Sequence, residues 1–142
     1  MNPNYNLDRF IEAQETEYER AYHEIQQGKK INHWMWYIFP QIAGLGKSST
    51  SRYFAIADAT EAELYLAHPV LGKRLAAICQ TLLNLENRSA YSIFGSPDDS
   101  KFLSCITLFE SIESPYSELF KKLIDKYYNG RRDKATLKLL ME

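Results

Sequence analysis

Apolar residues recur every three or four positions over residues 7–25, and this spacing predicts an amphipathic helix. Asn6 or Asp8 can cap its start, and Gly28 stands where a helix commonly ends in the left-handed region. The apolar stripe of this first helix consists of Leu7, Phe10, Ile11, Gln14, Tyr18, Ala21, Tyr22 and Ile25.

The middle of the chain repeats the helical pattern with different start and stop signals. Thr60-Glu61-Ala62-Glu63 has the form of a capping box, and the helix it begins should end near His68, because Pro69 disfavours the helical conformation of the residue before it. Pro69 then begins a helix to Leu85. Its inner stripe is Leu71, Leu75, Ile78, Cys79, Leu82 and Leu83.

Three more helices are predicted in the last third of the chain. Ser96-Pro97-Asp98-Asp99 provides a cap, a proline at the first position and two acids that the helix dipole favours, and the apolar pattern continues to about Glu113. Ser114-Pro115 begins a helix through Tyr128, and Asp133 caps a short last one.

Residues 34–39 are aromatic enough for a strand, but no partner strand is evident, so we expect them to be helical or irregular. The prediction is therefore an all-α domain of about seven helices, compact and single over residues 1–142. Its irregular Gly/Ser-rich segment, residues 40–51, follows the aromatic motif.

Composition agrees with one folded domain and limits its partners. The chain has 142 residues, of which 45% are hydrophobic and 25% charged, enough to form a core. The formal net charge is −1, so no electrostatic field favours nucleic acid as a partner. No apolar run is long enough for a membrane span, and the N-terminus has no signal-peptide pattern. Cys79 and Cys105 lie within apolar helical patterns, which indicates buried, reduced thiols. We expect a cytoplasmic protein with no membrane partner.

Candidate chemistry concentrates between His33 and Tyr53, where aromatic rings precede glycines, hydroxyls and an arginine. Two glycines allow backbone amides to converge on an anion, the hydroxyls add donors, and arginine can bind a phosphate or carboxylate with two parallel hydrogen bonds. The rings can stack on a base or a sugar. The predicted ligand-binding residues are Trp34, Trp36, Tyr37, Gln41, Gly44, Gly46, Ser48, Ser51, Arg52 and, from the second block, Lys101.

Plainer interpretations compete with this one. Aromatic side chains are mostly core residues, and glycine and serine runs are mostly turns and caps. Gly46-Lys47-Ser48 resembles the end of a phosphate-binding P-loop, but Gln41 stands where the first glycine should be, so a true P-loop is not expected. Phe39-Pro40 raises the question of a cis bond, and the trans form is the favoured interpretation.

Acid–base chemistry, if the protein is an enzyme, would fall to His33, Asp98 and Asp99. The plain alternatives are that His33 caps a helix and that the two acids only complement a helix dipole. His23, His33 and His68 include no pair spaced for metal binding, so no metal is expected, and the sequence specifies no cofactor.

With these residues identified, the chain resembles the DUF1810 family of bacterial proteins of unknown function. The resemblance rests on "HWMWYIFPQ", "GLG", "RYFAI", "YLAHPVLGKRL", "IFG", "DDSKFLSC", "TLF" and "NGRRDKATLKLL", and it extends over nearly the whole chain. It implies a mainly α-helical fold and no known activity. Members are often labelled calpastatin, a label to discard, because that inhibitor is disordered whereas 13% of this chain is aromatic.

The leading hypothesis is a pocket for a small anionic or nucleotide-like ligand, built from the segment "HWMWYIFPQ" to "GLGKSS" and faced by residues 98–101. The alternative is an interaction module, possibly a homodimer, without catalytic activity. Whether the protein is a monomer or a homodimer, and whether it is an enzyme, the sequence leaves open.

Overall fold

The computed structural model describes residues 5–142, and that part of the chain is mostly helical, without a strand. It contains nine helices rather than about seven: α1 (Asp8–Gln26), α2 (Met35–Ile38), α3 (Ser49–Tyr53), α4 (Ala59–Ala67), α5 (Leu71–Asn84), α6 (Ala90–Phe94), α7 (Asp98–Glu110), α8 (Ser117–Tyr128) and α9 (Lys134–Met141). The prediction missed α3 and α6, which have five residues each. Helices this short span little more than one turn, so no three- or four-residue repeat can reveal them.

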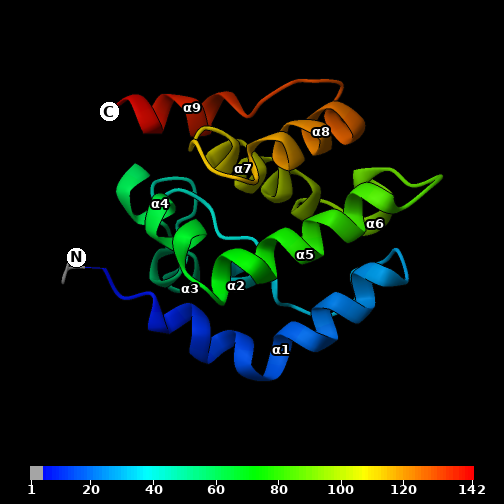
Figure 1. Ribbon diagram of the computed structural model, residues 1–142, viewed down its shortest axis with the longest axis horizontal. Coiled ribbons are helices and arrows are strands. Elements are labelled where there is room, and N and C mark those ends of the chain that lie inside the picture. Colours follow the sequence, from blue (N-terminus) through cyan, green and yellow to red (C-terminus); the bar gives the residue numbers. More distant parts are fainter. Residues whose placement is uncertain (1–4) are drawn as a thin grey trace.

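The last third of the chain packs around α7, and α5 lies between α1 and α8 (Figure 1). α7 packs against α4, α6, α8 and α9, while α5 packs against α1, α4 and α8. In Figure 1, α1 lies along the bottom, α5 crosses the middle, and α8 and α9 lie at the top. Residues 104–109 of α7 are all buried, so this helix is covered on every side over that stretch.

Aromatic rings fill the core on both sides of α7. The Phe102 ring stacks on Phe94 with centroids 4.8 Å apart and meets Phe39 edge-on at 5.0 Å. Farther along α7, the Phe109 ring lies 5.3 Å from that of Tyr65. Fully burying such a side chain contributes about 1.5–3 kcal/mol, so this cluster is a main source of stability.

Several helix ends differ from the expectation. α4 is capped by Asp58, whose side chain accepts from the Glu61 amide, and not by Thr60. No side-chain cap begins α7, and the Ser96–Pro97 bond before it is cis, whereas Phe39–Pro40 is trans as favoured. Asp133 does cap α9, accepting from the Thr136 amide, as predicted.

The segment between α2 and α4 is closed on itself by an isolated bridge between Ile42 and Ile56. The Ile56 amide donates to the Gln41 carbonyl and the Ala43 amide to the Ile56 carbonyl, both at 2.8 Å. This bridge holds the two ends of the Gly/Ser-rich segment together, with α3 between them. Within residues 5–142, no helix combines the length and apolarity that a membrane span requires.

Candidate functional site

The position of the aromatic segment is set by one buried carboxylate, Glu24 of α1. It accepts from the backbone amides of Ile31 at 2.7 Å and Asn32 at 3.0 Å, from Asn32 Nδ2 at 2.6 Å, and from Trp34 Nε1 at 2.8 Å. Burial alone would raise the pKa of Glu24, but these donors outweigh it and lower the pKa to about 2. A permanently ionised Glu24 therefore holds residues 30–34 against the end of α1.

Directly beyond this anchor, a small crevice opens between the start of α2 and the start of α7. It has a volume of about 90 Å³. We name it the His33 crevice, and its lining residues are Lys30, His33, Met35, Trp36, Asp98 and Lys101.

The polar groups of the His33 crevice centre on Asp98. Lys30 Nζ lies 2.7 Å from Asp98 Oδ2, and Lys101 Nζ lies 3.4 Å from Asp98 Oδ1. The Lys101 ammonium also lies 4.1 Å from the centroid of the Trp36 ring, a cation–π contact that positions the ammonium without neutralising it. Two ammonium groups thus share one carboxylate, which leaves one excess positive charge in a partly buried place.

His33 is the exposed member of this group. Its imidazole lines the crevice and makes no hydrogen bond or ion pair with the residues that the structure describes. Asp99, the neighbour of Asp98, does not line the crevice; its Oδ1 accepts from the Ser100 amide at 2.9 Å, which is the local role of an acid in a first helical turn.

The other rings of the aromatic segment face elsewhere. Trp34 is 0% exposed and lies in the core, because its indole N–H is bonded to Glu24. Tyr37 is half-buried, with its ring 5.2 Å from that of Phe54. Gln41 is buried, and its Nε2 has no hydrogen-bond partner within residues 5–142.

The Gly/Ser-rich segment contacts the crevice from behind, through Trp36. A side chain on Gly46 would come within 3.8 Å of the Trp36 ring and would collide with Ser51. Ser48 caps α3, accepting from the Ser51 amide at 3.1 Å, and Ser51 Oγ donates back to the Ser48 carbonyl at 2.9 Å. Both hydroxyls are therefore occupied within the segment, while Gly44 lies against Leu139 of α9.

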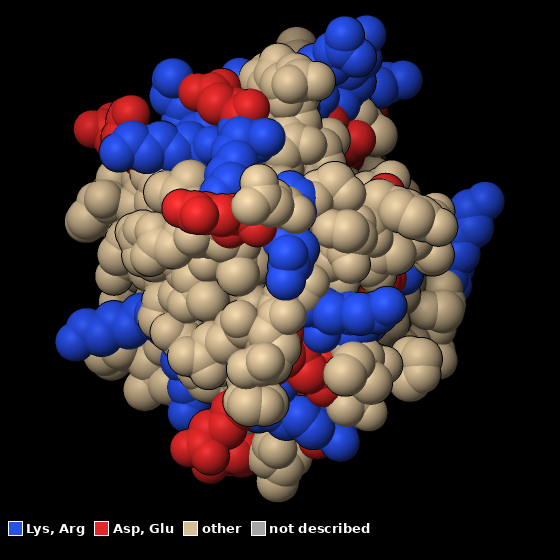
Figure 2. Space-filling view, turned by 90° about the vertical axis from the view of Figure 1, so that its right-hand side faces the viewer, with Lys and Arg blue, Asp and Glu red and all other residues tan. Residues whose placement is uncertain are grey.

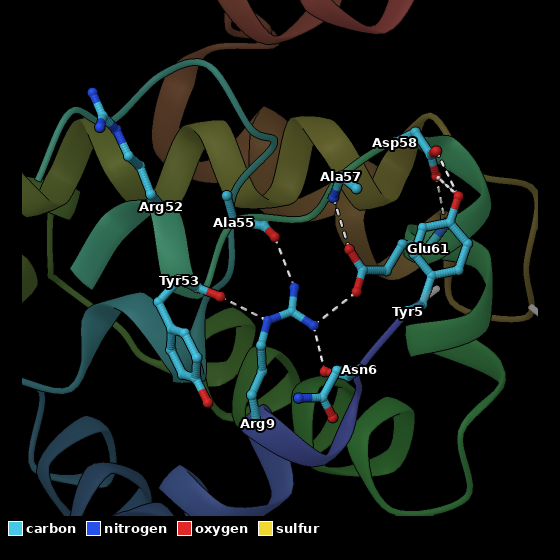
Figure 3. Close-up of a pocket in the computed structure, with 9 residues that line it drawn as sticks. All are labelled: Tyr5, Asn6, Arg9, Arg52, Tyr53, Ala55, Ala57, Asp58 and Glu61. Atoms are coloured by element: carbon cyan, nitrogen blue, oxygen red, sulfur yellow. Dashed lines mark hydrogen bonds and ion pairs between the residues drawn. The ribbon is translucent and has the colours of Figure 1, made fainter. Parts of the chain in front are cut away.

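Arg52 belongs to a second, larger hollow of about 570 Å³ near the start of α1. We name it the Arg9 hollow, and its lining includes Tyr5, Arg9, Arg52, Tyr53, Asp58 and Glu61 (Figure 3). In Figure 3 the Arg52 side chain points away from Arg9, toward solvent.

Arg9 lines this hollow and makes four hydrogen bonds there. Its Nη1 donates to Glu61 Oε2 at 2.8 Å and to the Asn6 carbonyl, its Nε to the Tyr53 carbonyl at 2.8 Å, and its Nη2 to the Ala55 carbonyl at 2.7 Å. The remaining Glu61 oxygen accepts from the Ala57 amide at 2.7 Å. These contacts fasten α1 to the segment that leads from α3 into α4.

The remaining candidates have structural surroundings. Cys79 and Cys105 are buried free thiols, and burial raises the pKa of both, which opposes thiolate chemistry. His68 Nδ1 accepts from the amides of Val70 and Leu71 at the start of α5. In the described part of the chain, no three His, Cys, Asp or Glu residues gather as a metal site would require.

Nearly the whole chain matches a family model. The model, described as "Protein of unknown function (DUF1810)", covers residues 4–140. The chain belongs to the DUF1810 family. The DUF1810 fold is also present in a solved structure, that of the conserved hypothetical protein Rv1873 from Mycobacterium tuberculosis, with 39% identity, a TM-score of 0.93 and 96% of each chain covered. No curated protein matches the sequence significantly.

In this DUF1810 protein, the His33 crevice joins two sequence blocks that lie far apart in the chain. His33 and Trp36 come from "HWMWYIFPQ", whereas Asp98 and Lys101 come from "DDSKFLSC". Four of the predicted residues, His33, Trp36, Asp98 and Lys101, therefore line one crevice. The other predicted residues line no part of it: Trp34, Tyr37, Gln41, Gly44, Gly46, Ser48, Ser51, Arg52 and Asp99.

Sequence reasoning overlooked Lys30 and Glu24. Glu24 follows Ala21 by one helical turn and precedes Ile25, so a charged residue on the buried stripe of α1 was a readable signal. Lys30 had no local signal, because its partner Asp98 is distant in sequence.

Proposed function

We propose that this DUF1810 protein binds a small oxyanion, such as a phosphate group, in the His33 crevice. The observation that supports it is the unequal charge of the crevice, where the ammonium groups of Lys30 and Lys101 share the single carboxylate of Asp98. An anion entering the crevice would supply the missing counter-charge.

Burial strengthens this argument. The side chain of Lys30 is 8% exposed, that of Asp98 18% and that of Lys101 26%. Charges this far from bulk water are weakly screened, so an uncompensated positive charge attracts an anion more strongly here than on an open surface. The exposed His33 imidazole adds an N–H donor toward the same space.

The size of the crevice limits what it can hold. The crevice, at about 90 Å³, is far smaller than the roughly 300–1,000 Å³ typical of sites that hold whole small molecules, so it suits a phosphate-sized group and not a whole nucleotide. If a reaction takes place on the bound group, His33 is the residue free to transfer a proton, because Asp98 is engaged by both lysines and Asp99 lies outside the crevice.

The alternatives have less support. The exposed large apolar residues among those described are Ile31, Tyr53, Val70, Tyr91 and Met141, and single exposed apolar side chains are ordinary. On the face shown in Figure 2, basic side chains are interspersed with acidic ones and form no continuous patch of the kind that binds nucleic acid. The cytoplasmic location stays a prediction.

Isothermal titration with inorganic phosphate at low salt tests the proposal. We expect Lys101→Met to weaken phosphate binding about tenfold or more, since hydrogen bonds to charged groups contribute about 1.5–3 kcal/mol. The matched control is Lys47→Met, which removes an exposed lysine outside the crevice. An undetectable affinity in the unaltered protein, or an equal loss in both variants, would contradict the proposal.

A further inference from the structure

A second hollow adjoins the His33 crevice and shares Lys30 with it. We name it the Tyr91 groove; it has a volume of about 360 Å³ and is lined by Lys29, Lys30 and residues 91–95. The Lys30 amide donates to the Ile93 carbonyl at 2.7 Å, while its ammonium reaches Asp98. Lys30 is therefore the residue that the two spaces have in common.

The groove presents an aromatic ring without a partner. Tyr91 of α6 is 66% exposed, and its side chain makes no ring contact or hydrogen bond with any residue in the range 5–142. An exposed phenol ring offers a flat apolar face on which another ring can stack. Beside two lysines, such a ring suits a ligand that is both aromatic and anionic.

The floor of the groove is open at Gly95. This residue has φ +72°, and a side chain built on it would find no atom within 4 Å. The glycine thus satisfies a left-handed backbone at the end of α6 and also leaves the main chain open to a ligand.

We infer that the Tyr91 groove holds the aromatic base of a nucleoside monophosphate, whose phosphate occupies the His33 crevice. This inference rests on the proposed function. The crevice admits only the phosphate, whereas the groove lies within the roughly 300–1,000 Å³ typical of small-molecule sites. Lys30 contacts the phosphate, and the ring stacks on Tyr91.

Calorimetric titration of the full chain with inorganic phosphate and with adenosine monophosphate separates the two ideas. Stacking of a base on an aromatic side chain predicts that adenosine monophosphate binds about 5- to 100-fold more tightly than phosphate. Tyr91→Ala should remove this gain and leave phosphate binding unchanged, and Tyr91→Phe should keep it. Both variants should fold, because the ring is exposed; the matched control is Tyr53→Ala, an exposed ring of the Arg9 hollow.

Each outcome decides one proposal. If phosphate binds and adenosine monophosphate binds no more tightly, or if Tyr91→Ala weakens both equally, the ring site is wrong and the oxyanion site stands. If neither probe binds, the proposed function fails and the ring site fails with it. If Tyr91→Ala changes the sedimentation mass and not ligand affinity, the ring belongs to an interface and the inference is overturned.

Discussion

The Arg9 hollow and the His33 crevice each contain a basic side chain paired with a buried or partly buried acid, yet their charges balance differently. In the Arg9 hollow, the Arg9 guanidinium meets one carboxylate and three backbone carbonyls, so its charge is balanced by Glu61 (Figure 3). In the His33 crevice, two ammonium groups meet one carboxylate. The ion pair of the Arg9 hollow is therefore balanced, whereas the His33 crevice has one more cation than anion.

The comparison teaches that the volume of a hollow and the charge balance within it are independent in this protein. The Arg9 hollow is several times larger, at about 570 Å³ against about 90 Å³, but its polar groups serve the fold. We expect substitutions in the Arg9 hollow to change stability, and substitutions in the His33 crevice to change ligand affinity.

The largest effect should follow from Arg9→Met. The substitution leaves the Glu61 carboxylate buried without its cation, and breaking a buried pair from one side costs about 3–5 kcal/mol. Urea denaturation monitored by circular dichroism measures this loss. Phosphate affinity of the folded fraction should not change.

The control for Arg9→Met is Lys121→Met, which removes an ion pair on α8 whose two side chains are each 51% exposed. An exposed pair of this spacing contributes about 0.3–0.5 kcal/mol, so the control should be nearly as stable as the original protein. Equal losses in the two variants would show that Arg9 does not fasten α1.

A smaller loss is expected for Glu24→Gln, which keeps the shape of the side chain and removes its charge. The pKa of Glu24 is about 2 in the folded protein against 4.5 ordinarily, so the ionised form contributes roughly 2–3 kcal/mol above pH 5. Because the folded pKa is the lower one, this contribution is lost as pH falls from about 4.5 toward 2.

The stability difference between the original protein and Glu24→Gln should therefore shrink by about half between pH 7 and pH 3. Urea titrations at the two pH values measure it. A difference that is independent of pH would mean that the Glu24 carboxylate is not held ionised by the donors around it.

The smallest effect, and the sharpest for the crevice, concerns Asp98→Asn. Removing the shared carboxylate takes away a competitor of the bound anion, so phosphate should bind about threefold to tenfold more tightly, measured by calorimetry. Asp99→Asn is the matched control, with the same charge change outside the crevice. Weaker binding by Asp98→Asn would indicate that the carboxylate itself contacts the ligand.

The long helices could be predicted from the sequence because their apolar stripes extend over several turns. α1 and α5 show such stripes, and α7 adds an acidic first turn. The five-residue α3 and α6 could not be predicted, because they are too short to show an apolar repeat. Capping by Ser48 and Ser89 and packing against distant residues stabilise them.

The sequence indicates which residue types could form a site, but it does not indicate which way each side chain points. The choice of His33, Trp36, Asp98 and Lys101 named side chains that do lie around one crevice. The sequence alone could not show that Trp34 lies outside the crevice, because its indole turns into the core to donate to Glu24 of α1. Similarly, the charge balance of the crevice depends on Lys30, which only the folded chain brings to Asp98.

The pairing of Ile42 with Ile56 has a practical consequence for handling the protein. The pairing fixes both stems of the loop that carries Lys47, an exposed residue directly before the Ser48 cap of α3, so that added length before Lys47 would project into solvent without displacing either stem. This position is a permissive point for inserting an epitope or a fluorophore, because an insertion there leaves α3 and its cap intact and lies outside the residues that line the His33 crevice and the Tyr91 groove.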